Sequence, residues 1–159
     1  MKLTRRYHFS ASHRLHSPEL TKAENTRLYG KCNYPFGHGH DYVLEVTVGG
    51  DADSNTGLLL PIAKLDRLVR EKVLQLIAHR NLNLDVPQFA HLIPTTENLA
   101  LVIADLLEEN WPAYLGQSPV RLHRIHIQET DRNGFELLLD SRPRTPARHR
   151  QTESVALNA

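Results

Sequence analysis

The sequence predicts an α+β domain whose elements follow the order ββααββ. Residues 3–13 and 42–48 alternate between apolar and polar side chains, as strands with one buried face do. Residues 62–76 and 99–107 instead place apolar side chains three or four positions apart, which is the spacing of one helical face. Two further strand-like segments follow the second helix. We therefore expect an antiparallel sheet with two helices packed on one of its faces.

The first strand is predicted from the parity of its apolar residues, and the second strand by the same rule. On the first strand one face carries Leu3, Tyr7, Phe9, Ala11 and His13. On the second strand one face carries Tyr42, Leu44, Val46 and Val48. The run GGDADSNTG that follows is rich in turn-forming residues, so the second strand should end there.

Both helices carry a recognisable start. Pro61 precedes the first helix, and proline is favoured near the first turn. The second helix begins at PTTEN, where a threonine can cap the helix and Glu97 lies in the first turn. The segments VRLHRIHIQE and FELLLD are then two strands joined by a turn at TDRNG. The parity of the first of these slips between Leu122 and Ile125, which indicates a β-bulge.

Length and composition indicate one domain over residues 1–141, followed by a basic flexible tail over 142–159. The formal net charge is only +1, so no global field favours nucleic acid or a membrane surface as a partner. A single cysteine excludes an internal disulfide and fits a reducing compartment. The start of the chain lacks a secretory h-region, and no apolar run approaches membrane-spanning length. We expect a soluble, cytoplasmic protein.

Three histidines form a candidate metal site. His38 and His40 flank Gly39, so in an extended backbone both imidazoles leave the same face. His13 ends the first strand on its apolar parity and is the natural third ligand. Three imidazoles suit Zn²⁺ with one position left open, which is the arrangement of catalytic zinc. The alternative is a glycine-rich turn that carries two ordinary histidines, with His13 as a core residue.

Cys32 has three candidate roles: a fourth zinc ligand, a small buried apolar residue or a catalytic thiolate. The polar and turn-forming residues around it, in GKCNYP, argue against a core position. Its place between Lys31 and the histidines predicts a lowered pKa, since nearby positive charge favours the thiolate.

Several segments together resemble the 6-pyruvoyltetrahydropterin synthase family, which includes the 6-carboxytetrahydropterin synthase of queuosine biosynthesis. The matching segments are FSASHRLHSPEL, YGKCNYPFGHGHDY, HRNLNLDVPQF, PTTENLA and QETDRNG. The resemblance covers about residues 5–140. It implies the family's tunnelling fold, assembly of trimers into a hexamer through a β-barrel, and active sites between subunits.

The resemblance also implies a role for each matching residue. His13, His38 and His40 would hold zinc. Cys32 would accept a proton, His79 of AHRN would be the relay histidine, and Glu129 of QETD would both join the relay and bind the pterin ring. Thr95, Thr96 and Glu97 of TTEN would contribute to the same pterin site. The basic neighbours Arg14 and Lys31 are candidate contacts for the substrate's triphosphate.

One residue departs from the family pattern. The family usually has an aspartate just before the relay histidine, where this chain has Ala78. Loss of an orienting carboxylate can lower a rate by orders of magnitude. The expected reaction is elimination of triphosphate from 7,8-dihydroneopterin triphosphate to give 6-pyruvoyltetrahydropterin. The alternatives are the 6-carboxy product with release of acetaldehyde, and a zinc-binding paralogue with altered catalysis.

Overall fold

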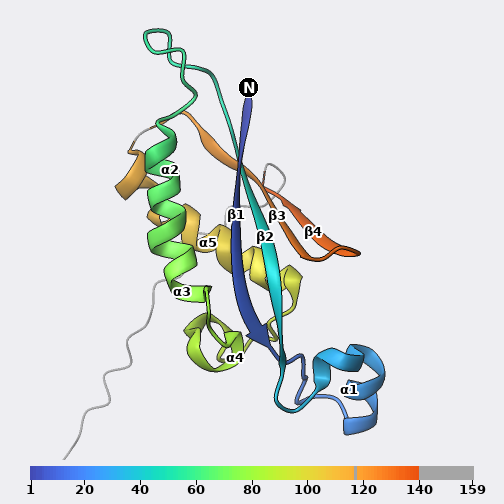
Figure 1. The fold of residues 1–159 in the computed structure, drawn as a ribbon. Coiled ribbons are helices and arrows are strands. Elements are labelled where there is room, and N and C mark those ends of the chain that lie inside the picture. Colours follow the sequence, from blue (N-terminus) through green and yellow to red (C-terminus); the bar gives the residue numbers. More distant parts are fainter. Residues whose placement is uncertain (117, 140–159) are drawn as a thin grey trace, which may run out of the picture.

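A computed structural model describes residues 1–116 and 118–139. Its four strands form one antiparallel sheet in chain order, β1-β2-β3-β4. The strands are β1 (Lys2–His13), β2 (His38–Gly49), β3 (Arg121–Thr130) and β4 (Asn133–Leu138). This sheet and the two long helical segments that cover one of its faces confirm the predicted α+β class and the main ββααββ order (Figure 1). The proposed tail, 142–159, lies outside the described residues, so its separation from the domain stays a prediction.

The long pairing of β1 with β2 fixes which side chains face the helices. Twelve consecutive pairs run from Lys2 opposite Gly49 to His13 opposite His38 without a register shift. On the helix-facing side Phe9 stacks on Tyr42, with ring centroids 4.9 Å apart. The side chains of one parity are therefore carried into the core along the full length of both strands.

The predicted bulge in β3 is present. Thr47 of β2 lies opposite Arg124, but the next residue, Val48, lies opposite Leu122. One residue of β3, His123, is therefore extra in the ladder. The bulge lets both Leu122 and Ile125 be buried although they are three positions apart.

The first predicted helix is continuous but not uniform. It consists of α2 (Ile62–Val69), a π-helical turn (Arg70–Leu74) and α3 (Gln75–Ile77). The second is α5 (Thr96–Leu115), capped by Thr95, whose Oγ1 accepts from the N–H of Asn98 at 3.3 Å. Both pack on the same face of the sheet and bury a common set of apolar residues (Figure 1). That set includes Leu65, Leu68, Val69, Val73, Ile77, Leu99, Ile103, Leu107, Leu44, Val46, Ile125 and Ile127.

One helix was absent from the sequence prediction. Helix α1 (Lys22–Tyr29) begins with a capping box, in which Thr21 and Glu24 each satisfy the other's backbone N–H. It continues into a 3₁₀ turn (Gly30–Asn33) that carries Cys32. Asn25 is fully buried and donates to the carbonyl oxygens of Ser17 and Leu20, each at 2.9 Å, which ties α1 to the segment after β1.

Two short elements, α4 (Leu82–Asp85) and a 3₁₀ turn (Pro87–Phe89), connect α3 to α5. Just before α4 the chain runs alongside the outer edge of β1. The N–H of His79 donates to the carbonyl of Ser10 at 2.7 Å, and the N–H of Ser12 donates to the carbonyl of Arg80 at 2.9 Å. This backbone pairing positions His79.

None of the described helices is both long and apolar enough to cross a membrane.

Candidate active site

Three imidazoles converge where β1 ends and β2 begins. The register places His13 opposite His38 and Ala11 opposite His40, so all three rings leave the helix-facing side of the sheet. Their centroids are 5.2 Å apart for His13 and His38, 5.1 Å for His13 and His40, and 4.5 Å for His38 and His40. The structure therefore brings together the three residues that the sequence grouped as one candidate site.

The separation of one pair of ring nitrogens, those of His38 and His40, fits a tetrahedral ion. The Nε2 atoms of His38 and His40 are 3.3 Å apart. Two nitrogens that each lie about 2.0–2.1 Å from a tetrahedral zinc ion are about 3.3–3.4 Å from one another. The two imidazoles therefore already hold the separation that a shared ion requires.

His13 is oriented for the same purpose. Its Nδ1 is 2.9 Å from the carbonyl oxygen of Pro94, so this nitrogen carries the proton and donates. Its Nε2 is buried and has no hydrogen-bond partner among the described residues. A buried nitrogen lone pair without a donor is costly unless something else occupies it, and a metal ion does so.

Burial also favours the protonation state that metal binding needs. Burial lowers the pKa of His13, and it lowers the pKa of His38, with a smaller contribution from the neighbouring His40. Neutral imidazole is the form that binds a metal. The residues present therefore fit a zinc ion.

Gly37 permits the close approach of β1 and β2 at this point. Its φ is +70°, and a Cβ there would lie 2.6 Å from the carbonyl oxygen of His13. No other residue type fits that position without displacing the strand end that carries His13.

Cys32 lies beside the cluster on the 3₁₀ turn after α1. Its Sγ and the ligand nitrogens of His13 and His38 all lie within 4.8 Å of one another. Burial raises the pKa of the Cys32 thiol, and the negative charge of Glu129 raises it further. The predicted lowering is therefore wrong for the chain by itself, because Lys31 is exposed, the thiol is partly buried and the charge that acts on it is that of the Glu129 carboxylate.

Glu129, at the end of β3, completes the other side of the cluster. Its Oε1 is 3.8 Å from the Nε2 of His13 and 3.8 Å from the Nε2 of His40. Its Oε2 accepts from the side-chain amide of Asn133 at 2.7 Å, which holds the carboxylate in place. Cys32 and Glu129 are thus two ionisable groups that lie against the histidine cluster.

Tyr42 was predicted only as a core residue of its strand, but it also belongs to the site. Its side chain is buried, and burial together with the Glu129 carboxylate raises the pKa of its hydroxyl. Its ring centroid is 5.6 Å from that of His40. The signal was available in the sequence, because Tyr42 shares the parity of His38 and His40.

The TTEN segment lies behind His13 rather than inside the cluster. Thr95 caps α5, Thr96 is buried in the first turn, and Glu97 is exposed. Pro94, just before them, accepts the hydrogen bond from His13. Among the described residues, Glu97 is not part of either group of closely spaced metal-ligating atoms.

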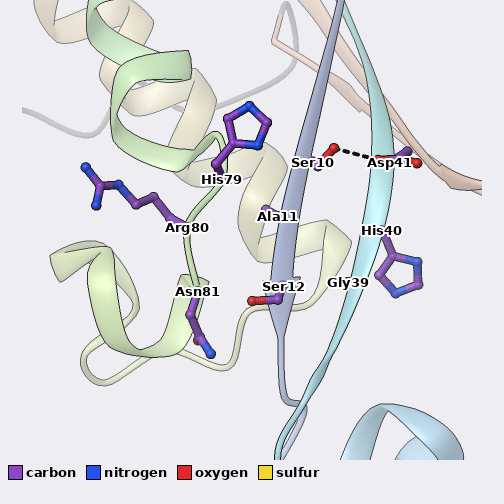
Figure 2. A pocket seen from close by; sticks show the side chains of 9 residues that line it. All are labelled: Ser10, Ala11, Ser12, Gly39, His40, Asp41, His79, Arg80 and Asn81. Carbon is purple, nitrogen blue, oxygen red and sulfur yellow. Dashed lines mark hydrogen bonds between the residues drawn. The ribbon is translucent and has the colours of Figure 1, made fainter.

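His79 lies in an open pocket beside β1, and His40 is the member of the three-histidine cluster that also lines this pocket. Ser10, Ser12, Asp41 and His40 also line this pocket, and the His79 ring stands on the α3 side of β1 while the His40 ring stands beside β2 (Figure 2). His79 is exposed and has a φ of +59°, the one left-handed conformation of a non-glycine residue in the described chain. No described carboxylate forms an ion pair with it.

A four-stranded antiparallel sheet, two helices on one face and a histidine cluster at the strand ends define a class of α+β protein with a candidate metal-binding site. The family model described as 6-pyruvoyl tetrahydropterin synthase matches residues 2–138. The chain belongs to this family.

Individual relatives agree with that assignment. The chain is 43% identical over 132 residues to human 6-pyruvoyl tetrahydrobiopterin synthase, which covers 83% of this chain and 87% of the human protein. It is 35% identical over 100 residues to the dihydroneopterin monophosphate aldolase of Pyrococcus furiosus, covering 63% of this chain and 76% of that protein. The structure of the 6-pyruvoyl tetrahydropterin synthase of Caenorhabditis elegans superposes with a TM-score of 0.78 at 37% identity, over 87% of this chain and 94% of that one.

Proposed function

We propose that the chain is a zinc-dependent lyase that converts 7,8-dihydroneopterin triphosphate into 6-pyruvoyltetrahydropterin with loss of triphosphate. The observation that carries the proposal is the close packing of the His13, His38 and His40 rings, with the Cys32 thiol beside His13 and His38 and the Glu129 carboxylate beside His13 and His40. Family membership supports the same reaction. A zinc ion held by the three imidazoles would act as a Lewis acid toward the side-chain hydroxyls of the substrate.

Cys32 is the proposed base. As a thiolate it takes a proton from the substrate side chain, and this step opens the way to loss of the triphosphate. Its raised pKa in the isolated chain means that the thiolate depends on positive charge brought to the site. Glu129, which is fixed by Asn133, is placed to pass protons on during the tautomerisation.

Glu97 and Glu129 are the proposed acceptors for the pterin ring. Carboxylates match the ring N–H and amino groups, which form a donor face. Glu129 lies in the cluster of this chain, whereas Glu97 is exposed at the start of α5. With Thr95 and Thr96 it would contribute to the pterin site from the start of α5.

We propose that His79 acts in the active site of a neighbouring chain. Its exposure, and the position of its ring across β1 from that of His40, support this arrangement (Figure 2). It requires a homo-oligomer, for which we propose a trimer or a hexamer built through a β-barrel. Mass photometry of the purified chain measures the assembly, and a stable monomer with full activity would contradict the trans role of His79.

The decisive experiment is incubation with 7,8-dihydroneopterin triphosphate followed by mass analysis of the products. We expect 6-pyruvoyltetrahydropterin and triphosphate. A 6-carboxy product with acetaldehyde would instead assign the chain to the carboxy-forming branch. If the protein contains stoichiometric zinc but does not turn over, it is a catalytically altered paralogue. If it contains no zinc, the proposed mechanism is refuted.

Cys32→Ala separates the roles of thiol and metal. We expect turnover to fall by about 10²- to 10⁴-fold, because that is the usual contribution of a positioned base. Elemental analysis should show an unchanged zinc content. Loss of zinc in this variant would mean that Cys32 is a ligand, and the site would then be closed and structural.

A further inference from the structure

A partly buried guanidinium lies one residue beyond the metal site without a counter-charge. Arg14 follows His13 directly, where the chain leaves β1. Its Nε is buried and has no hydrogen-bond partner, and no described carboxylate forms an ion pair with it. A buried, unsatisfied cationic donor in a native fold calls for a missing partner, and an anion is the partner that fits it.

The backbone of Arg14 is held by hydrogen bonds that do not involve its side chain. Its N–H donates to the Oδ1 of Asn83 at 2.7 Å, and its carbonyl accepts from the Nδ2 of Asn83 at 2.9 Å. These two bonds involve only the backbone of Arg14. Its guanidinium is thus presented by a rigid support and is not itself needed to hold the segment.

His16 adds a second donor next to it. The Nδ1 of His16 faces two donors, the side-chain amide of Asn33 at 3.0 Å and the Nη2 of Arg14 at 3.4 Å. Because Nδ1 must then accept, the ring proton lies on Nε2, which is left as a donor. Arg14 and His16 therefore offer N–H groups and no acceptor, which is the chemistry of an anion site.

Backbone contacts join this pair to the proposed base. The N–H of Leu15 donates to the carbonyl of Cys32 at 2.7 Å, and the side-chain amide of Asn33 donates to the carbonyl of Leu15 at 2.7 Å. The segment that carries Arg14 and His16 is thus tied to the turn that carries Cys32. A substrate bound at the candidate metal site could extend a polyphosphate tail toward Arg14 and His16.

We propose that Arg14, assisted by His16, binds the triphosphate group of the substrate. This inference rests on the proposed function for the identity of the substrate. The exposed Lys31 was an equal candidate from sequence, but the structure favours Arg14, because an ammonium that is already hydrated has less to gain from an anion than a guanidinium with a buried, unsatisfied N–H.

The test measures binding rather than turnover. Full-length, zinc-loaded protein is titrated in a calorimeter with inorganic triphosphate, supplied as its magnesium complex so that it does not compete for zinc, and separately with 7,8-dihydroneopterin, which lacks phosphate. We expect Arg14→Met to weaken triphosphate binding by about 10- to 100-fold, the usual cost of losing a hydrogen bond to a charged group. Its affinity for 7,8-dihydroneopterin should stay within about twofold.

Two further variants are the controls. Arg27→Met removes the same charge from an exposed position on α1 and should change neither affinity. Arg14→Lys keeps the charge but not the planar fork, and should bind triphosphate with intermediate affinity. Unchanged triphosphate binding in Arg14→Met, or an equal loss for both ligands, would overturn the inference. A chain that binds triphosphate through Arg14 but forms no pyruvoyl product would refute the proposed function alone.

Discussion

Two residues beside the site adopt the left-handed backbone conformation, and they do so under different constraints. Gly37, just before the paired histidines, has a φ of +70°, and any Cβ there would meet the strand end that carries His13. His79 has a φ of +59° but keeps a full side chain, which lies exposed in an open pocket. Position 37 is occupied by glycine, which adopts this conformation without strain. Position 79 is occupied by histidine, which does not.

The difference separates a group of residues that is complete within one chain from a residue, His79, whose side chain lacks a partner in the described chain. Around Gly37, the imidazoles of His13, His38 and His40 lie together within one chain, and the Nε2 atoms of His38 and His40 are 3.3 Å apart. At His79 the backbone stores strain, of the order of 1–2 kcal/mol, for a side chain that meets no described carboxylate. Strain of this kind persists where a residue serves a function, so the comparison supports a role for His79 outside its own chain.

The largest expected effect comes from removing a ligand. His38→Ala should lower zinc affinity by at least about 100-fold, because two imidazoles remain of the three that would hold the ion. His8→Ala is the matched control, since His8 is exposed on the opposite face of β1. Zinc content after dialysis measures both. Equal retention of zinc by the two variants would contradict the three-histidine site.

Gly37→Ala should destabilise the fold by about 2–4 kcal/mol, from backbone strain plus the contact with the His13 carbonyl. Gly57→Ala has nearly the same φ, +69°, but a Cβ there meets nothing within 4 Å, so it should cost only about 1 kcal/mol. Urea denaturation gives both free energies of unfolding. If both variants lost the same free energy of unfolding, the contact between a Cβ at position 37 and the His13 carbonyl would not contribute to the loss.

His79→Gly should act in the opposite sense on stability. Glycine relieves the left-handed strain, so the free energy of unfolding should rise by about 0.5–1 kcal/mol, while turnover should fall if His79 is the relay imidazole that we propose. The same denaturation and a steady-state assay measure the two effects. A variant that loses stability would show that the imidazole holds the fold, which is a structural role.

Ala78→Asp should give the smallest change. A carboxylate next to His79 can orient the imidazole and stabilise its charged form, so we expect a few-fold rise in turnover. Ala78→Asn has a similar shape without the charge and is the control. If the aspartate variant is no faster than the asparagine variant, the chain orients His79 by other means.

Sequence periodicity predicted the elements that depend on burial. The alternation in β1 and β2 predicted that His13, His38 and His40 share a face, and the parity slip predicted the bulge at His123. Helix α1 was not predicted because it has no apolar face, although its capping box at Thr21 and Glu24 is visible in the sequence. The place of Glu129 beside two histidines depends on how β3 pairs with β2, and the φ of His79 depends on its pairing with β1. Neither is encoded in a local pattern.

The π-helical turn at residues 70–74 has a consequence for how this part of the chain tolerates change in length. Such a turn holds one more residue than an α-helical turn, so it sets the angle and height at which the following residues leave the helix. Deleting one residue inside this turn would let it close to α-helical geometry, so the residues after it would keep nearly their present direction. Deleting one residue from α2 would instead rotate everything after it by about 100° and draw it back by about 1.5 Å, which would displace the segment that pairs with the edge of β1.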